Sequence, residues 1–134
     1  MEVDTITSII IEKSINIHKA LGPGLLESAY KECLAFELLK SGLHLEKEKP
    51  VPLIYKGVEL NCGYRIDLHV ENKVVVEIKS VEGLAPIHVA QVLTYLKLIN
   101  NKIGLLINFN EELLKDGIMR LYNKHYKPKN NFNK

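Results

Sequence analysis

The chain has 134 residues and a formal net charge of +2 at pH 7, and its apolar and charged fractions are 46% and 25%. This size and composition predict a single globular domain with a hydrophobic core. The charge is too small to indicate nucleic-acid binding by itself, and no apolar run reaches the roughly 18–20 residues that span a bilayer.

The cysteine content and the N-terminal residues indicate the cellular compartment that we expect for this protein. Cys33 and Cys62 are too few for a disulfide framework, and the opening "MEVDTITSII" lacks the basic start and cleavage site of a signal peptide. We therefore expect a cytoplasmic protein with reduced thiols and no membrane segment.

Two helices are expected in the N-terminal third. Apolar residues recur at helical spacing between Ile6 and Ile17. The "GPG" at 22–24 ends this helix, because Gly supports a left-handed C-cap and Pro cannot continue a helix. A second helix follows over residues 25–41, with Gly42 as its stop.

A β region comes next. Strands are predicted over residues 44–53, 59–70 and 74–80. Pro50 and Pro52 mark the first as an edge strand or an irregular one, since proline cannot donate to a sheet ladder.

The remaining elements are a helix, a strand and a short final helix. Pro86 suits the first turn of a helix that reaches about Asn100. Residues 102–109, "KIGLLINF", form a continuous apolar run typical of a strand buried on both faces. Residues 111–123 predict a last short helix or two turns.

The predicted order ααβββαβα indicates an α/β fold with a mixed β-sheet flanked by helices. We assign residues 1–122 to one domain and residues 123–134 to a basic tail. No acidic residue follows Asp116, whereas the basic residues continue with Arg120, Lys124, Lys127, Lys129 and Lys134. Such a tail either lies along phosphates or is a solvated, frayed end.

The segment "YRIDLHVENKVVVEIKS", residues 64–80, places charges in the most strand-like part of the chain. Alternation assigns one face of its first strand to Tyr64, Ile66, Leu68 and Val70, and the other to Arg65, Asp67 and His69. A two-residue turn at Glu71–Asn72 would put Asp67 and Glu77 on opposite faces. A three-residue loop over 71–73, which we predict, puts Asp67 opposite Glu77 and Arg65 opposite Lys79.

Two facing carboxylates repel each other, and a divalent cation relieves that repulsion. Two or three oxygen ligands with open water positions are typical of Mg²⁺. Lys79, on the same face as Glu77, would add positive charge where negative charge develops in phosphoryl transfer. The alternative is a surface ionic ladder in which Asp67 and Glu77 pair with Arg65 and Lys79.

Two helical motifs carry further polar residues. In "GLLESAY", Glu27 and Tyr30 share a helical face, although a Glu that favours the helix dipole and a Tyr that packs would also explain them. His88, Gln91 and Tyr95 form one polar stripe on the third helix. The stripe either faces the sheet, where it would reach the charged hairpin, a water or a DNA phosphate, or is exposed to solvent.

Together, "GLLESAY", "YRIDLHVENKVVVEIKS", "AQVLTYL" and "GLLINF" resemble the sequence blocks of the GxxExxY proteins, which are small members of the PD-(D/E)xK nuclease superfamily. The resemblance extends from about Ile6 to Tyr122 and implies a restriction-endonuclease-like core. It departs from the pattern at Ile66, which precedes Asp67 where the superfamily name has a proline.

The resemblance also implies roles for single residues. Asp67, Glu77 and the backbone carbonyl of Ile78 would bind Mg²⁺, with Mn²⁺ as a substitute, and Lys79 would orient or activate the attacking water. Glu27 would lie near the metal and hold a second ion or a water. The residues expected to border the site and contact the substrate are Gln91, Tyr95, Tyr30, Arg65 and His88.

We therefore expect a Mg²⁺-dependent nuclease that hydrolyses phosphodiester bonds in DNA, with nucleic acid as its partner. The alternative is a non-catalytic module of the same fold that binds nucleic acid or a partner protein. A small domain without an evident DNA-reading insertion favours a partner or a homodimer.

Overall fold

The computed structural model describes residues 1–129. Its elements in chain order are α1 (Val3–Leu21), α2 (Glu27–Lys40), β1 (Leu45–Pro50), β2 (Leu53–Tyr55), β3 (Val58–Leu60), β4 (Arg65–Val70), β5 (Val74–Lys79), α3 (Pro86–Ile99), β6 (Ile103–Asn108), the 3₁₀ turn η1 (Leu114–Gly117) and β7 (Ile118–Tyr122). None of the helices in this part of the chain is both long and apolar enough to cross a membrane.

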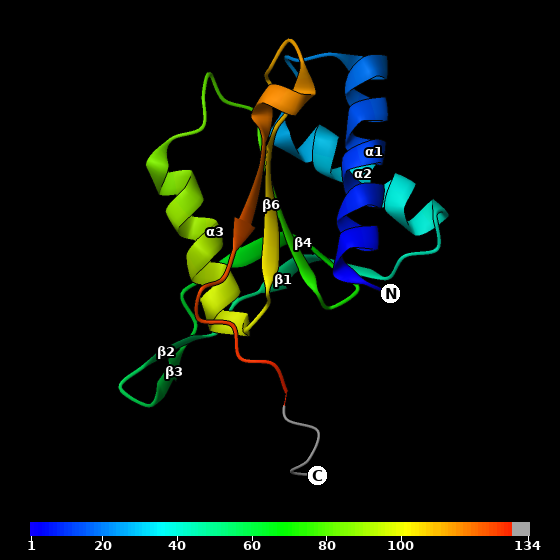
Figure 1. The fold of residues 1–134 in the computed structure, drawn as a ribbon. Coiled ribbons are helices and arrows are strands. Elements are labelled where there is room, and N and C mark those ends of the chain that lie inside the picture. The colour runs from blue at the N-terminus through cyan, green and yellow to red at the C-terminus, as the bar shows by residue number, and fades with distance from the viewer. Residues whose placement is uncertain (130–134) are drawn as a thin grey trace.

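Five strands form one mixed sheet in the order β1-β4-β5-β6-β7. β5 and β6 are parallel and joined by α3, whereas the other neighbouring strands are antiparallel. α1 and α2 cover one side of the sheet and α3 covers the other (Figure 1). This arrangement confirms the predicted fold class and is consistent with a restriction-endonuclease-like core.

The two faces of the sheet hold cores of different size. The larger cluster lies under α1 and α2 and receives Val74, Val76 and Ile78 from β5. The smaller cluster lies under α3 and receives Val75 from the same strand. β5 therefore alternates as predicted, and every residue of β6 is buried, as expected for a strand covered on both faces.

β4 does not alternate throughout, which corrects the prediction for Ile66. Leu68 and Val70 belong to the larger cluster, but Ile66 packs in the smaller one with Val75 and Tyr95. The change of side occurs across Asp67, where the regular pairing with β5 stops after Leu68. The chain is thus twisted at the position of the predicted site.

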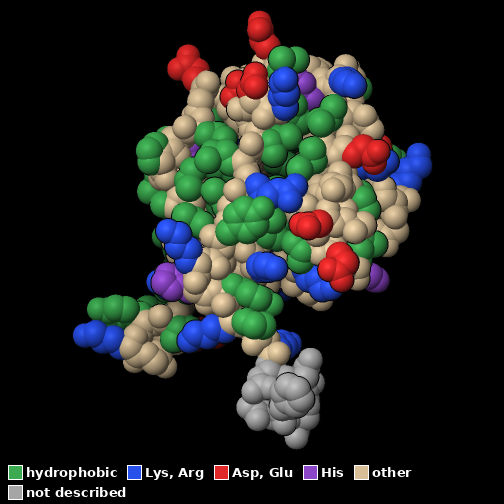
Figure 2. Space-filling view, in the orientation of Figure 1, with side chains coloured by type: hydrophobic (Ala, Val, Ile, Leu, Met, Phe, Trp, Pro, Cys, Tyr) green, Lys and Arg blue, Asp and Glu red, His purple; other side chains and the backbone are tan. Residues whose placement is uncertain are grey.

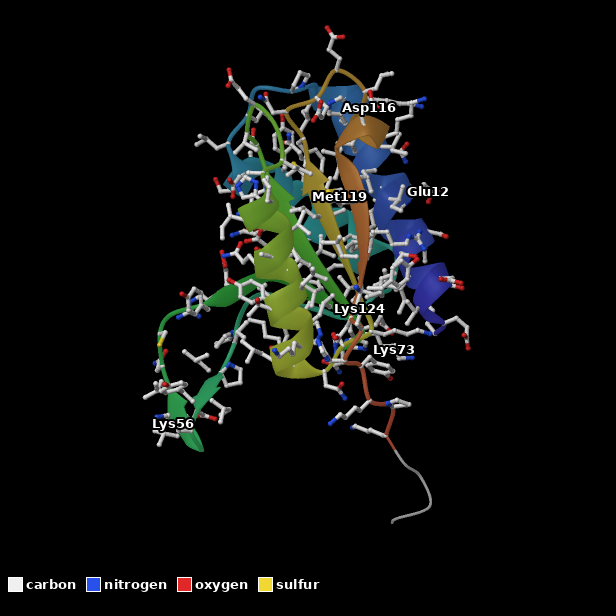
Figure 3. All side chains as sticks on the ribbon, turned by 60° about the vertical axis from the view of Figure 1, so that its left-hand side comes forward. Glu12, Lys56, Lys73, Asp116, Met119 and Lys124 are labelled. Atoms are coloured by element: carbon white, nitrogen blue, oxygen red, sulfur yellow. The ribbon has the colours of Figure 1, made fainter. Side chains whose placement is uncertain are left out.

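The predicted three-strand region contains five strands. β1 is an edge strand that ends at Pro50, as the prolines indicated. β2 and β3 form a separate hairpin, with Lys56 at its tip, that extends away from the main sheet (Figures 1 and 3).

Of the helix or two turns predicted over residues 111–123, the chain forms only the short η1 turn; the strand β7, which pairs antiparallel with β6, follows and was not predicted. The reversal depends on Gly117, because a Cβ there would lie 2.4 Å from the carbonyl oxygen of Asn108. Glycine also disfavours a continuous helix. The free edge of β6 then takes up Ile118–Tyr122 as the outermost strand.

Candidate active site

The predicted register of the β4–β5 hairpin is confirmed. Val70 pairs with Val74 and Leu68 with Val76, so the loop has three residues and Asp67 lies opposite Glu77. Glu71 and Asn72 take positive φ values of 55° and 57°, which Asn tolerates better than most residues.

Beyond Leu68 and Val76, hydrogen bonds from backbone to side chain replace the backbone ladder between the two strands. The N–H of Asp67 donates to Oε2 of Glu77 at 2.7 Å, and the N–H of Ile78 donates to Oδ2 of Asp67 at 2.8 Å. Each carboxylate therefore bonds to the backbone of the opposite strand. This exchange fixes the two acidic groups side by side at the open end of the hairpin.

The two carboxyls differ in exposure: Glu77 is buried, with only 3% of its surface exposed, and Asp67 is half-buried. Burial, followed by the negative charge of Asp67, raises the pKa of the Glu77 carboxyl to about 8. Burial also raises the pKa of Asp67, against the opposing effect of the Ile78 N–H. None of the ion pairs among the described residues includes either carboxylate.

One oxygen of each carboxylate stays available. None of residues 1–129 donates a hydrogen bond to Oδ1 of Asp67 or Oε1 of Glu77. Because the N–H and C=O of a strand residue point to the same neighbour, the Ile78 carbonyl also faces β4 at this level. Three oxygen donors thus come from two adjacent strands, which fits a hard divalent cation.

Lys79 ends β5 beside the carboxylates. It is half-buried, and its positive charge lowers the pKa of both Asp67 and Glu77. Its ammonium group forms no ion pair within 4.0 Å in the described part of the chain. The cation is therefore near the acidic pair without being neutralised by it, unlike the surface ladder that was the alternative prediction.

α3 brings two residues of the predicted polar stripe to the site. Tyr95 is 4% exposed, and burial, then the charges of Glu77 and Asp67, raise its pKa to about 12. Gln91, one helical turn before Tyr95 on α3, acts in the opposite direction and lowers the pKa of Tyr95. The ring of Tyr64 lies edge-on to Tyr95, with 6.4 Å between centroids.

His88, the third residue of the stripe, caps the helix. Its Nδ1 accepts a hydrogen bond from the N–H of Ala85 at 2.9 Å, which satisfies a free donor at the start of α3. Arg65 is exposed and donates to the carbonyl oxygen of Glu48 on β1 at 3.4 Å. Substrate contacts for these two residues stay predictions.

Glu27 and Tyr30 lie at the start of α2. Glu27 is its first residue and is exposed, and the carbonyl of Leu25 just before it accepts a hydrogen bond from Ser80 Oγ at 2.7 Å. The loop before α2 therefore contacts the end of β5, directly after Lys79. In residues 1–129 no group of three or more His, Cys, Asp or Glu side chains is arranged to hold a metal, so the role of Glu27 stays a prediction.

Tyr30 has a positioning role. It is fully buried, stacks on Phe109 with 4.4 Å between centroids, and donates from its hydroxyl to the carbonyl of Gly22 at 2.5 Å. The same hydroxyl accepts a hydrogen bond from the N–H of Leu25. These contacts hold the loop that leads into Glu27, and they leave the side chain no exposed surface for a substrate.

Two residues near Asp67, Glu48 and Lys31, were not predicted from the sequence to belong to the site. Glu48 has a φ of 53° and lies opposite Asp67, between the pairs Lys47–Leu68 and Lys49–Ile66. Its carboxylate forms an ion pair with Lys31 of α2, and both charges affect the pKa of Asp67. The run "EKEK" resembles a solvated edge strand, and nothing in it signals a left-handed backbone.

A family model described as the PD-(D/E)XK nuclease superfamily matches residues 4–121. No curated protein and no solved structure matches the chain. The match supports a nuclease-like function, and nucleases of this superfamily generally use divalent metal ions. Membership of the GxxExxY proteins in particular stays a prediction. The match covers most of the chain, including all of the residues at the open end of the hairpin, and the chain belongs to the PD-(D/E)XK nuclease superfamily.

Proposed function

We propose that this protein is a Mg²⁺-dependent nuclease that hydrolyses phosphodiester bonds in DNA. The observation that carries the proposal is the pair Asp67 and Glu77, which face each other across two strands, each with one carboxylate oxygen that accepts no hydrogen bond from residues 1–129. A buried pair of like charges without a cationic partner is costly, and a divalent cation removes that cost.

Asp67, Glu77 and the backbone carbonyl of Ile78 are the groups that would hold the ion, and Glu27 is the candidate for a further ligand or a bound water. Mn²⁺ has similar ligand preferences and is expected to substitute. When bound, the metal supplies Lewis acidity and neutralises charge on the phosphate.

The chain's own residues have distinct tasks. Lys79 orients the attacking water and stabilises negative charge that develops on the phosphate oxygens, because its ammonium is close to the carboxylates and forms no ion pair within residues 1–129. Tyr95 and Gln91 close the site on the α3 side and restrict water there. Tyr30 holds the loop before Glu27.

The test is cleavage of supercoiled plasmid and of labelled single- and double-stranded oligonucleotides, in Mg²⁺, in Mn²⁺ and in chelator. We expect cleavage only with metal, and Asp67→Asn should reduce it by at least about 100-fold. Asp116→Asn is the matched control, because Asp116 is an exposed aspartate on η1 that the proposed mechanism does not use (Figure 3).

Calorimetric titration with Mn²⁺ separates the two functions considered. Binding that Asp67→Asn abolishes, together with cleavage, supports the nuclease. Wild-type protein that binds DNA but neither binds Mn²⁺ nor cleaves would support the non-catalytic module and exclude the nuclease. The predicted homodimer stays a prediction, which light scattering of the purified protein tests.

A further inference from the structure

A cavity of about 630 Å³ lies at the end of the molecule where the C-terminal segment leaves the body. It is bounded by the start of α1, the β4–β5 loop, the C-terminal end of α3 and the segment after β7. Lys and Arg side chains gather around this end in Figure 2, and Figure 3 shows Lys73 close to the start of the same segment.

Lysines from four separate parts of the chain line the cavity, and among the described residues that line it Glu2 is the only acidic one. They are Lys49 of β1, Lys73 of the β4–β5 loop, Lys102 before β6, and Lys129. Lys49 pairs with Glu46 at 3.1 Å, and Lys73 donates to the Met1 carbonyl at 2.8 Å. Lys102 and Lys129 form no ion pair within the described residues, so their charges are free for a ligand.

The segment that leads to Lys129 is held against the end of α3, which argues against a frayed end for residues 123–127. Two hydrogen bonds join Asn100 and Lys127. Nδ2 of Asn100 donates to the carbonyl oxygen of Lys127 at 2.8 Å, and the N–H of Lys127 donates to Oδ1 of Asn100 at 3.0 Å. Asn123 donates to the carbonyls of Leu96 and Asn101. This part of the tail is folded, not frayed; residues 130–134, with Lys134, lie outside the described residues.

The cavity adjoins the candidate active site. His69 lines it and lies two residues beyond Asp67 on the same strand, a step of about 6.6 Å. Ile99 and Asn100 also line it and lie about one helical turn beyond Tyr95. His69 is buried, and its Nδ1 has no hydrogen-bond partner among residues 1–129, so this part of the cavity wall contains an unsatisfied polar atom.

We propose that this cavity is a binding site for phosphate groups, supplied by the nucleic-acid strand whose next segment lies at Asp67 and Glu77. Ammonium groups and amide N–H donors are the groups that contact phosphate oxygens in proteins. The choice of a nucleic-acid strand as the source of the phosphate rests on the proposed function. The cavity positions the strand and does not take part in the chemical step.

The experiment measures fluorescence anisotropy of a labelled single-stranded oligonucleotide with the full chain in chelator, so that nothing is cleaved. The test variant is Lys102→Ala/Lys129→Ala, because both lysines are exposed and lack ion-pair partners among residues 1–129. We expect about tenfold weaker binding and a salt dependence whose slope falls by about 1.4, the value for two lost phosphate contacts on a single strand.

Lys19→Ala/Lys115→Ala is the matched control, since it removes the same charge at the opposite end of the fold, where both lysines line another cavity. The control should bind within about twofold of wild type. An equal loss of affinity in both variants would mean that only net charge matters, and it would overturn the proposal. Unchanged affinity in the test variant would also overturn it.

A mononucleotide and inorganic phosphate are titrated as competitors to identify the source of the phosphate. Weak competition supports a strand that is held by several phosphates. A mononucleotide that binds as tightly as the oligonucleotide, with the same lysine dependence, would overturn the strand as the source. Because all of this is measured without metal, failure of Mg²⁺-dependent cleavage would remove the proposed nuclease and leave the binding result unchanged.

Discussion

The two ends of the β4–β5 hairpin differ in how the strands are joined. At the closed end, residues 68–70 pair with residues 74–76 through a regular ladder, and the side chains that face α1 and α2 are apolar and fully buried. At the open end, Asp67 and Glu77 replace the ladder with side-chain bonds to the opposite backbone. The same two strands thus contain a rigid apolar segment and, one residue further, a charged one.

This difference suggests that the closed end contributes mainly to stability and the open end to the proposed activity. Apolar burial at the closed end favours folding, whereas two buried carboxyls with raised pKa values oppose folding at neutral pH. The packed apolar residues at the closed end therefore compensate for the unfavourable free energy of the carboxyls at the open end. Substitutions at the open end should therefore mainly affect cleavage, and substitutions at the closed end should mainly affect the free energy of unfolding.

The largest contrast is expected between Lys79→Met and Val76→Ala. Loss of the ammonium should lower cleavage by at least about 100-fold and change the free energy of unfolding by less than about 1 kcal/mol. Val76→Ala removes two buried methyl groups and should cost about 2–3 kcal/mol of stability, with cleavage per folded molecule unchanged. Denaturant titration and cleavage rates measure both; a stability loss in Lys79→Met equal to that of Val76→Ala would contradict the separation.

Glu77→Gln should stabilise the metal-free protein. The folded-state pKa of Glu77 is about 8 against an ordinary 4.5, so the carboxyl opposes folding increasingly as pH rises through this window. The amide keeps an oxygen for the Asp67 N–H, and we expect a gain of about 1–3 kcal/mol at pH 8.5 that is nearly absent at pH 4.5. Chemical denaturation in chelator measures the gain. Glu112→Gln, at an exposed position, is the control, and a gain independent of pH would refute the assignment.

The same shift predicts a pH dependence of metal binding. A metal competes with the proton that Glu77 retains below pH 8, so Mn²⁺ affinity should rise by up to about tenfold per pH unit between pH 6 and 8 and then level off. Isothermal titration calorimetry gives the affinities. A flat profile over this range would mean that Glu77 is not a ligand.

A smaller effect is expected at the neighbouring ion pair. Lys31→Met removes a positive charge close to Asp67 and should increase Mn²⁺ affinity a few-fold, since that charge opposes a bound cation. Lys47→Met is the matched control, because Lys47 pairs with Glu32 and also joins β1 to α2, at an exposed position. Similar affinities in the two variants would show that Lys31 does not act on the site.

The register of the hairpin was predictable because its pattern is local. A one-residue shift would place Glu77, and not Val76, on the face that Leu68 and Val70 present to the larger core, so the apolar pattern favours the three-residue loop over the two-residue turn. β7 was not predictable, because Ile118–Tyr122 becomes a strand only through the exposed edge of β6. The left-handed backbone of Glu48 likewise depends on Lys31 and Asp67, which are distant in sequence.

Phe109 connects the two parts of the candidate site through the interior. Its ring stacks on Tyr30, which holds the loop before Glu27, and its N–H donates to the carbonyl of Lys79 at 2.9 Å. One fully buried aromatic residue therefore contacts both the tyrosine that holds the loop before Glu27 and the backbone of Lys79. If the proposed chemistry uses both groups, a substitution of Phe109, which has no exposed atom, should alter it from the interior.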